Sequence, residues 1–151
     1  MKLRTFRYEY GAGPFATKHE LLGKWRTGNC RRAVQYFLYH VRGIFLAPQN
    51  ILLPEAYQDT GEFIFEESQP IDFTVLETAD IIYAEKIGRT SVPDEDSRIL
   101  HLHTALWAGE PAKEIWHATA TTGTSGYWPL ERFLKMYKPV AVKRITICAT
   151  I

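Results

Sequence analysis

Two stretches of this chain decide its fold: 99-ILHLHTALWA-108 and 113-KEIWHAT-119. Both are rich in apolar and β-branched or aromatic residues, and a short connection separates them, so they predict two neighbouring antiparallel strands. Successive side chains of a strand point to opposite faces, and His101 and His103 therefore share one face. His117 lies on the second strand, where pairing brings it beside His103 or His101.

Upstream of these strands, the clearest element is a helix. Its apolar side chains recur at helical spacing and share one face: Cys30, Val34, Phe37, Leu38 and Val41. Asn29 is placed to cap the first turn, and Gly43 is placed to end the helix. Cys30 is therefore predicted in the first helical turn, on the face turned toward the core.

The other elements complete an α+β pattern. Strands are also predicted at 3–10, 62–66, 79–85 and 139–148, and short helices from Thr17 and from Trp128-Pro129 through about Tyr137. Residues 121–126, between the predicted strand at 113–119 and the helix from Trp128-Pro129, have small side chains and are predicted to be flexible. Helices followed by about five strands with short connections predict a Cys-bearing helix packed on an antiparallel sheet of about five strands.

Composition limits the class of protein. A chain of 151 residues with 46% hydrophobic residues is sized for one domain, predicted here over 1–151, with a packed core. Lys and Arg number 18 against 17 Asp and Glu, a balance that argues against a broad nucleic-acid-binding surface. No stretch approaches the roughly 18 apolar residues of a membrane span. Residues 1–15 lack an apolar signal core, so we expect a cytoplasmic protein unless other means deliver it to a cell wall.

Cys30 has surroundings that favour a thiolate. A helix N-terminus carries a partial positive charge of about half a unit, and Arg31 and Arg32 add positive charge nearby. A thiolate nucleophile needs an imidazole as proton shuttle, and the strand histidines supply one. The alternative is an inert cysteine on a core helix. We interpret Cys148, near the end of the chain, as structural.

Three blocks of the sequence carry a resemblance to a known family: NCRRAVQY at 29–36, LETADIIY at 76–83, and HTALWAG at 103–109 with IWHA at 115–118. They resemble blocks of the NlpC-type peptidoglycan peptidases, which are papain-like cysteine hydrolases. The resemblance implies a papain-like fold with a Cys-His-His triad. Cys30 would be the nucleophile, His103 rather than His101 the general base, and His117 the residue that orients the His103 ring.

The resemblance also implies a substrate and where it binds. The family acts on stem peptides of peptidoglycan, so the expected reaction is cleavage of an amide bond in such a peptide or in a γ-glutamyl-type substrate. Asn29 replaces the family's Asp, Arg31-Arg32 replace its Ser-Gly, and Trp25 is the aromatic residue nearest to the position of its substrate-binding Tyr. We expect Asn29, Arg31, Trp25 and His101 to bind substrate, and the arginines favour an anionic one.

Three other functions fit the same residues. A papain-like acyltransferase or deamidase would use the same thioester chemistry. A binding module could keep the fold without catalysis, because the residues around Cys30 differ from the family pattern. His101, His103 and His117 could instead hold zinc. Our prediction remains a cysteine hydrolase with a peptide or cell-wall-fragment substrate and with neither cofactor nor metal.

Overall fold

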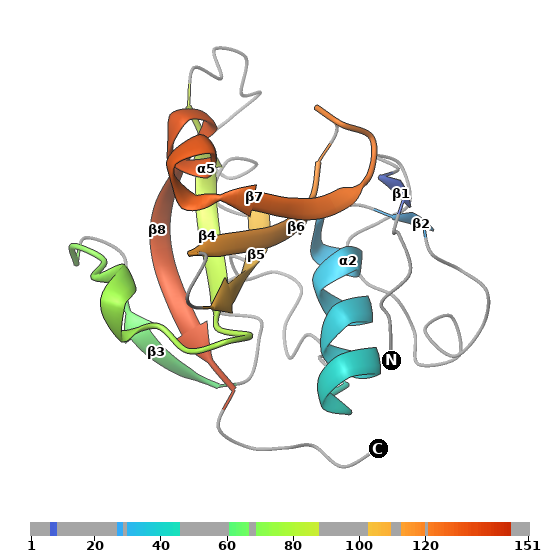
Figure 1. The fold of residues 1–151 in the computed structure, drawn as a ribbon. Coiled ribbons are helices and arrows are strands. Elements are labelled where there is room, and N and C mark those ends of the chain that lie inside the picture. The colour runs from blue at the N-terminus through green and yellow to red at the C-terminus, as the bar shows by residue number, and fades with distance from the viewer. Residues whose placement is uncertain are drawn as a thin grey trace, which may run out of the picture.

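The structure is a computed structural model that describes residues 7–8, 27–28, 30–45, 61–66, 69–87, 103–109, 113–119 and 121–145. Within these ranges the chain forms a six-stranded sheet, a two-stranded pair and two α-helices (Figure 1). In the order of the chain, the strands of the large sheet are β3 (Glu62–Phe65), β4 (Ile81–Lys86), β5 (His103–Gly109), β6 (Glu114–Ala118), β7 (Ser125–Pro129) and β8 (Tyr137–Arg144).

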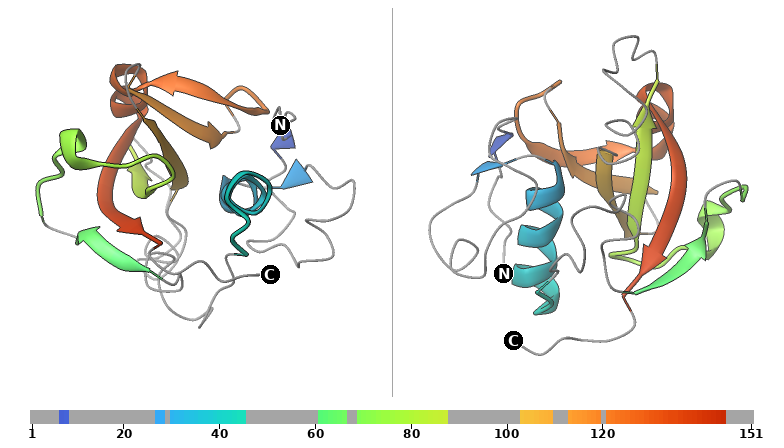
Figure 2. Two further views of the ribbon diagram at one scale, coloured as in Figure 1. Left: turned by 60° about the horizontal axis from the view of Figure 1, so that its bottom comes forward. Right: turned by 180° about the vertical axis from the view of Figure 1, so that it is seen from behind.

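The large sheet is antiparallel throughout, with the spatial order β3-β8-β4-β5-β6-β7. It is strongly curved, and Figure 2 shows α2 standing beside it. The small pair, β1 (Arg7–Tyr8) and β2 (Thr27–Gly28), is parallel, and β2 lies just before α2 in the chain. Arg7 also forms an isolated bridge with Thr124, so the small pair is joined to the turn that leads into β7.

The helix that carries Cys30 begins where the sequence predicts. Helix α2 spans Cys30–Phe37, and the chain continues with the wider turns of a π-helix, η2, over Leu38–Arg42. Gly43 ends it at φ +68°, a left-handed conformation that glycine adopts without strain. The amide of Gly43 donates to the carbonyl of Tyr39 at 3.1 Å, which satisfies one of the last helical carbonyls.

Two apolar clusters cover the two faces of the sheet. The first joins α2 to side chains of the central strands: Val34, Phe37, Ile81, Tyr83, Leu106 and Trp116. The second joins the alternate side chains of the same strands to helix α5 (Leu130–Met136) and the start of β8: Ile82, Ala105, Trp107, Ile115, Phe133 and Tyr137. Because the central strands are buried on both faces, their sequences are almost continuously apolar.

The sheet has six strands rather than the expected five or so. The additional strand is β7, in a region where we predicted a flexible connection followed directly by a helix. All five of its residues pair with β6, from Glu114 opposite Pro129 to Ala118 opposite Ser125. Gly126 and Pro129 weaken the strand signal in the sequence, and a proline at the end of an edge strand costs no ladder bond. Helix α5 therefore starts one residue after Pro129.

Strand β4 also begins later than predicted, at Ile81 rather than residue 79. Ala79 has φ +76°, which is incompatible with an extended strand. The predicted helix from Thr17, residues 99–102 and Cys148 lie outside the described residues. In the described ranges, neither helix has the length and apolar character that crossing a membrane requires.

Candidate active site

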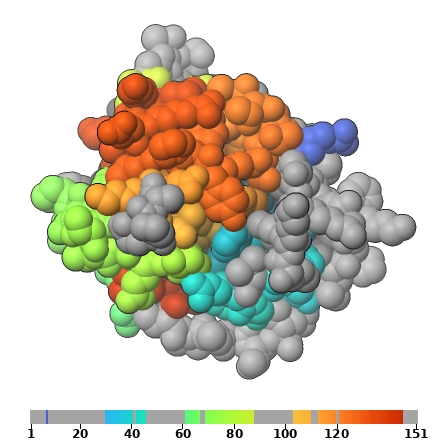
Figure 3. Space-filling view, in the orientation of Figure 1, coloured from blue at the N-terminus to red at the C-terminus, as the bar shows by residue number. Residues whose placement is uncertain are grey.

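Cys30 is the first residue of α2 and is partly exposed. Its Sγ accepts a hydrogen bond from the backbone N–H of Thr104, at 3.5 Å. Thr104 directly follows His103, the first residue of β5. The contact therefore joins the beginning of the helix to the beginning of the strand that carries His103. Figure 3 shows α2, in cyan, meeting the orange β5–β7 region at the surface of this face.

The two strand histidines contact each other directly. Nε2 of His103 lies 2.7 Å from Nδ1 of His117, and the ring planes are nearly perpendicular at 85°. The register of β5 and β6 pairs Leu106 with Trp116, and continuing that register places Ala105 opposite His117. His103 is the next residue on the same face, so its ring reaches His117 along the diagonal of the ladder.

Aromatic rings enclose the pair of histidines. The ring of Tyr137 stacks on His103 with centroids 4.2 Å apart and an angle of 16° between the planes. Trp128 stands perpendicular to His117 at 4.4 Å, and Phe133 approaches the same ring at 5.3 Å. These rings come from β7, α5 and β8, so three elements beyond the two histidine strands shape the site. The sequence analysis did not identify these rings as part of a site, because no spacing links them to β5.

Burial keeps both histidines uncharged. Desolvation lowers the pKa of His103 well below 6.5, and the charges of His117 and Lys86 lower it further. Burial lowers the pKa of His117 to about 3, with a smaller contribution from the charge of Arg132. At neutral pH both imidazoles are therefore neutral, and each carries one proton. One ring must donate and the other accept across the 2.7 Å contact.

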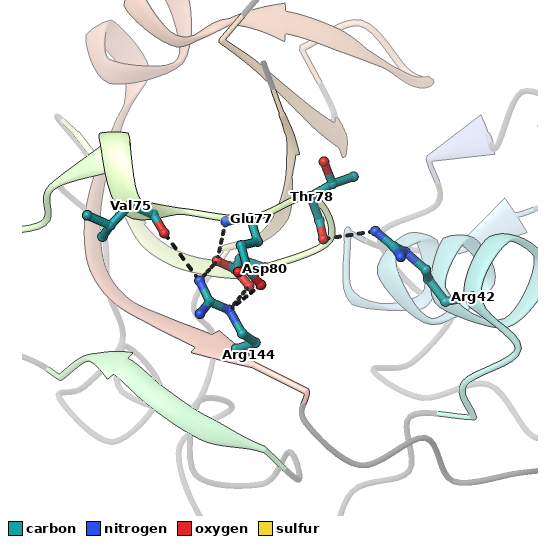
Figure 4. Close-up of polar contacts among 6 residues, drawn as sticks. All are labelled: Arg42, Val75, Glu77, Thr78, Asp80 and Arg144. Carbon is teal, nitrogen blue, oxygen red and sulfur yellow. Dashed lines mark hydrogen bonds and ion pairs between the residues drawn. The ribbon is translucent and has the colours of Figure 1, made fainter. Parts of the chain in front are cut away.

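A charged cluster lies at the end of β5 that is remote from His103. Nε and Nη2 of Arg144 each donate to the carboxylate of Asp80 at 2.9 Å, and the amide of Glu77 donates to the same carboxylate at 2.8 Å (Figure 4). The carbonyl of Asp80 accepts from the amide of Trp107 at 2.9 Å. Asp80 is 1% exposed, so this ion pair anchors the turn before β4 to the sheet from inside.

The turn at Thr78 and Ala79 packs tightly against β5 and the end of η2. Nη2 of Arg42 donates to the carbonyl of Thr78 at 3.1 Å, as Figure 4 shows. Gly109, at φ +100°, has no room for a side chain, since an added Cβ would lie 2.5 Å from Oγ1 of Thr78. This close approach explains why a glycine ends β5.

Comparison with known proteins supports the fold. No protein-family model and no curated protein matches the sequence. Solved structures that are similar include NlpC2 and NlpC1 from Trichomonas vaginalis. NlpC2 aligns with a TM-score of 0.54 at 16% identity, over 91% of this chain and 41% of that one. NlpC1 aligns with a TM-score of 0.54 at 18% identity, over 92% and 38%.

The chain has an NlpC-like fold. The similarity supports the predicted papain-like α+β fold, and the structure combines helices with an antiparallel sheet that has one strand more than predicted. The chain spans about two fifths of the length of each of the two NlpC structures. Their low sequence identity shows the fold alone, so the chemistry has to be argued from the residues themselves.

The predicted substrate-binding residues are placed only in part. Asn29, Trp25 and His101 lie outside the described residues. Arg31 lies in the NlpC-like helix α2 with its side chain fully buried, while Arg32 is partly exposed. In the described part of the chain, no three His, Cys, Asp or Glu side chains are arranged to hold a metal ion. Substrate binding by Asn29, Arg31, Trp25 and His101 stays a prediction.

Proposed function

We propose that this protein is a cysteine hydrolase in which Cys30 is the nucleophile, His103 the general base and acid, and His117 the residue that orients His103. The observation that carries the proposal is the 2.7 Å contact between Nε2 of His103 and Nδ1 of His117. Beside it, the Sγ of Cys30 contacts the backbone of Thr104, the residue that follows His103. The elements that carry Cys30, His103 and His117 are thus joined by two contacts, one between α2 and β5 and one between β5 and β6.

The neutral state of His103 suits a general base. A base must be unprotonated to accept the thiol proton, and burial holds the pKa of His103 well below 6.5. Nε2 is engaged by His117, so Nδ1 is the nitrogen left to take the proton. In that tautomer the Nε2–H of His103 donates to Nδ1 of His117, and the proton of His117 resides on its Nε2.

The reaction proceeds through a thioester. Sγ of Cys30 attacks the carbonyl carbon of an amide, and His103 passes the thiol proton to the leaving amine. Water, deprotonated by His103, then attacks the thioester and releases the carboxylic acid and the thiol. In this mechanism the backbone N–H of Cys30, at the N-terminus of α2, would donate to the oxyanion.

The substrate that we propose is an amide bond in a peptidoglycan stem peptide or a γ-glutamyl-type compound. The NlpC-like fold and the order Cys30, His103, His117 along the chain support this substrate class. Turnover is tested by mass spectrometry on a panel of stem peptides and γ-glutamyl amides. We expect hydrolysis by the wild type, and a loss of about 1000-fold or more in kcat/KM for Cys30→Ala and for His103→Ala.

The matched control is Cys148→Ser, which removes the other thiol of the chain and should leave turnover within about twofold. Circular dichroism of Cys30→Ala establishes that the fold is kept. Hydrolysis that survives in folded Cys30→Ala would exclude Cys30 as the nucleophile. Absence of turnover on every member of the panel, with ordinary binding of wall fragments, would favour a non-catalytic binding module.

A further inference from the structure

Tyr137 contacts the histidines of the proposed triad, and Thr119 contacts Tyr137. Tyr137 is the first residue of β8, and Thr119 directly follows β6. The hydroxyl of Tyr137 and Oγ1 of Thr119 are 3.0 Å apart, and both residues are 3% exposed. The amide of Thr121 donates to the same Oγ1 at 3.3 Å. The phenol is thus tied to the turn after β6.

The ring of Tyr137 covers one face of His103. With centroids at 4.2 Å and planes 16° apart, the two rings are in stacking contact. The hydrogen bond to His117 holds only one edge of the His103 ring, at Nε2. A stacked ring adds a second constraint, because it limits rotation of the imidazole out of its plane. Together the two contacts define where Nδ1 lies.

The same phenol lies within electrostatic reach of the nucleophile. Burial raises the pKa of Tyr137, the hydrogen bond from Thr119 lowers it, and the charge of a Cys30 thiolate raises it again. The turn that holds the phenol also reaches the segment before α2. Thr124 bridges to Arg7 in β1, and β1 pairs with β2, two residues before Cys30. The turn therefore contacts Tyr137 on one side and, on the other, the strand that pairs with β2.

We propose that Tyr137, held by Thr119, is a positioning residue whose stacked ring fixes the plane of the His103 imidazole relative to the thiol of Cys30. This inference rests on the proposed hydrolase function. The effect of Tyr137 on the His103 ring can be measured without substrate, so that the positioning role and the hydrolase function can be rejected independently.

The charge state of His103 depends on several neighbours. Among the described residues, the titratable groups around it are His117 on β6, Lys86 on β4, Tyr137 on β8 and the thiol of Cys30 on α2. Of these, Tyr137 covers the flat face of the ring. Removing that cover admits water, which favours the charged imidazolium and raises the pKa of His103 toward 6.5.

The experiment compares Tyr137→Met with Tyr137→Phe in the full chain. Methionine fills much of the volume but has no flat ring, whereas phenylalanine keeps the ring and lacks only the hydroxyl. Imidazole resonances of ¹⁵N-labelled protein, assigned with His103→Gln, are followed from pH 8 to pH 5. We expect the pKa of His103 to stay well below 6.5 in the wild type and in Tyr137→Phe. In Tyr137→Met we expect His103 to titrate at least one pH unit higher than in the wild type.

Kinetics provide the second measurement. On a hydrolysed substrate, Tyr137→Met should lower kcat about tenfold or more and change KM less than threefold, while Tyr137→Phe should stay within about threefold in kcat. If Tyr137→Met does not fold, Tyr137→Leu, which also lacks the flat ring, serves instead and should lower kcat about tenfold or more. Thr119→Val, like Tyr137→Phe, leaves the stacked ring in place and should stay within about threefold in kcat.

Two results would overturn the proposal. One is a folded Tyr137→Met in which His103 titrates as in the wild type. The other is a Tyr137→Phe that changes His103 as much as Tyr137→Met does, since the ring would then not be the positioning element. A wild type that turns over no substrate but shows the expected titrations would reject the hydrolase function and leave the positioning intact.

Discussion

The His103–His117 centre and the Asp80–Arg144 cluster hold polar side chains on the same sheet by opposite means. Around the two histidines, burial among aromatic rings lowers both pKa values and keeps the imidazoles neutral. At the other end of β5, the hydrogen bond to Asp80 raises the pKa of Arg144 and keeps the guanidinium charged. Charge is excluded where the two imidazoles contact each other and is paired where the turn before β4 is anchored to the sheet.

The largest effect on stability is expected in the Asp80–Arg144 cluster. Asp80→Asn should lower the free energy of unfolding by about 2–3 kcal/mol, because Arg144 loses its paired charge in a site with little access to water. This loss is small for the breaking of a buried ion pair, because the side chain of Arg144 is 26% exposed. Urea denaturation at pH 7.5 measures it.

The matched control for this prediction is Glu77→Gln. Glu77 also contacts Arg144, at 3.2 Å, but its side chain is 69% exposed. An exposed ion pair contributes little, so we expect a change below about 0.5 kcal/mol. Equal effects of the two substitutions would show that the buried carboxylate of Asp80 is not the anchor, and the contrast between the two regions would be lost.

The neutral imidazoles of the His103–His117 centre predict that the free energy of unfolding falls in acid. Unfolded histidine has a pKa near 6.5 and binds protons first as the pH falls, while His117 stays neutral in the fold down to about 3. Its contribution to stability is thus complete above pH 6.5 and is lost as the pH falls below it. His117 alone should account for a loss of about 2 kcal/mol between pH 7.5 and pH 5.

Urea denaturation at the two pH values tests this loss. In His117→Gln the difference between pH 7.5 and pH 5 should shrink by about that amount. The control His40→Gln removes a partly exposed histidine of η2, outside the centre, and shows whether the loss is specific to His117. An unchanged pH dependence in His117→Gln would mean that His117 is not held neutral.

The smallest effect is expected at the turn that carries Asp80. Ala79 has φ +76°, a conformation that costs an L-residue about 1 kcal/mol. Ala79→Gly relieves that strain but adds entropy to the unfolded chain, so a net gain in stability of about 0.5 kcal/mol is expected. Ala108→Gly in β5 is the control, because Ala79 and Ala108 both pack against the apolar cluster that joins α2 to the sheet. It should lower the free energy of unfolding by about 0.5–1 kcal/mol.

Thermal unfolding of both glycine variants gives the sign directly. Stabilisation by Ala79→Gly with destabilisation by Ala108→Gly would locate backbone strain in the charged region. Destabilisation by both would show that the turn tolerates alanine without strain.

Much of the architecture could be read from periodicity. The start of α2 at Cys30, the end of η2 at Gly43 and the two histidine strands follow from the sequence, because side-chain direction repeats every 3.6 residues in helices and every two in strands and because glycine is typical of a helix end. Strand β7 could not be read in this way, since Gly126 and Pro129 hide its pattern and only pairing with β6 defines it. The late start of β4 was not predicted either, because the sequence does not show that Ala79 has a positive φ.

By itself, the sequence determined that a cysteine opens a helix and that histidines face the same way on two neighbouring strands. Only the tertiary structure decided that His103 contacts His117, that burial keeps both neutral, and that Tyr137 covers the ring. The physical reason is the separation along the chain over which each property is set. Periodicity is a local property of the backbone, whereas register, desolvation and ring stacking depend on residues that meet only when β5, β6, β7, α5 and β8 pack together.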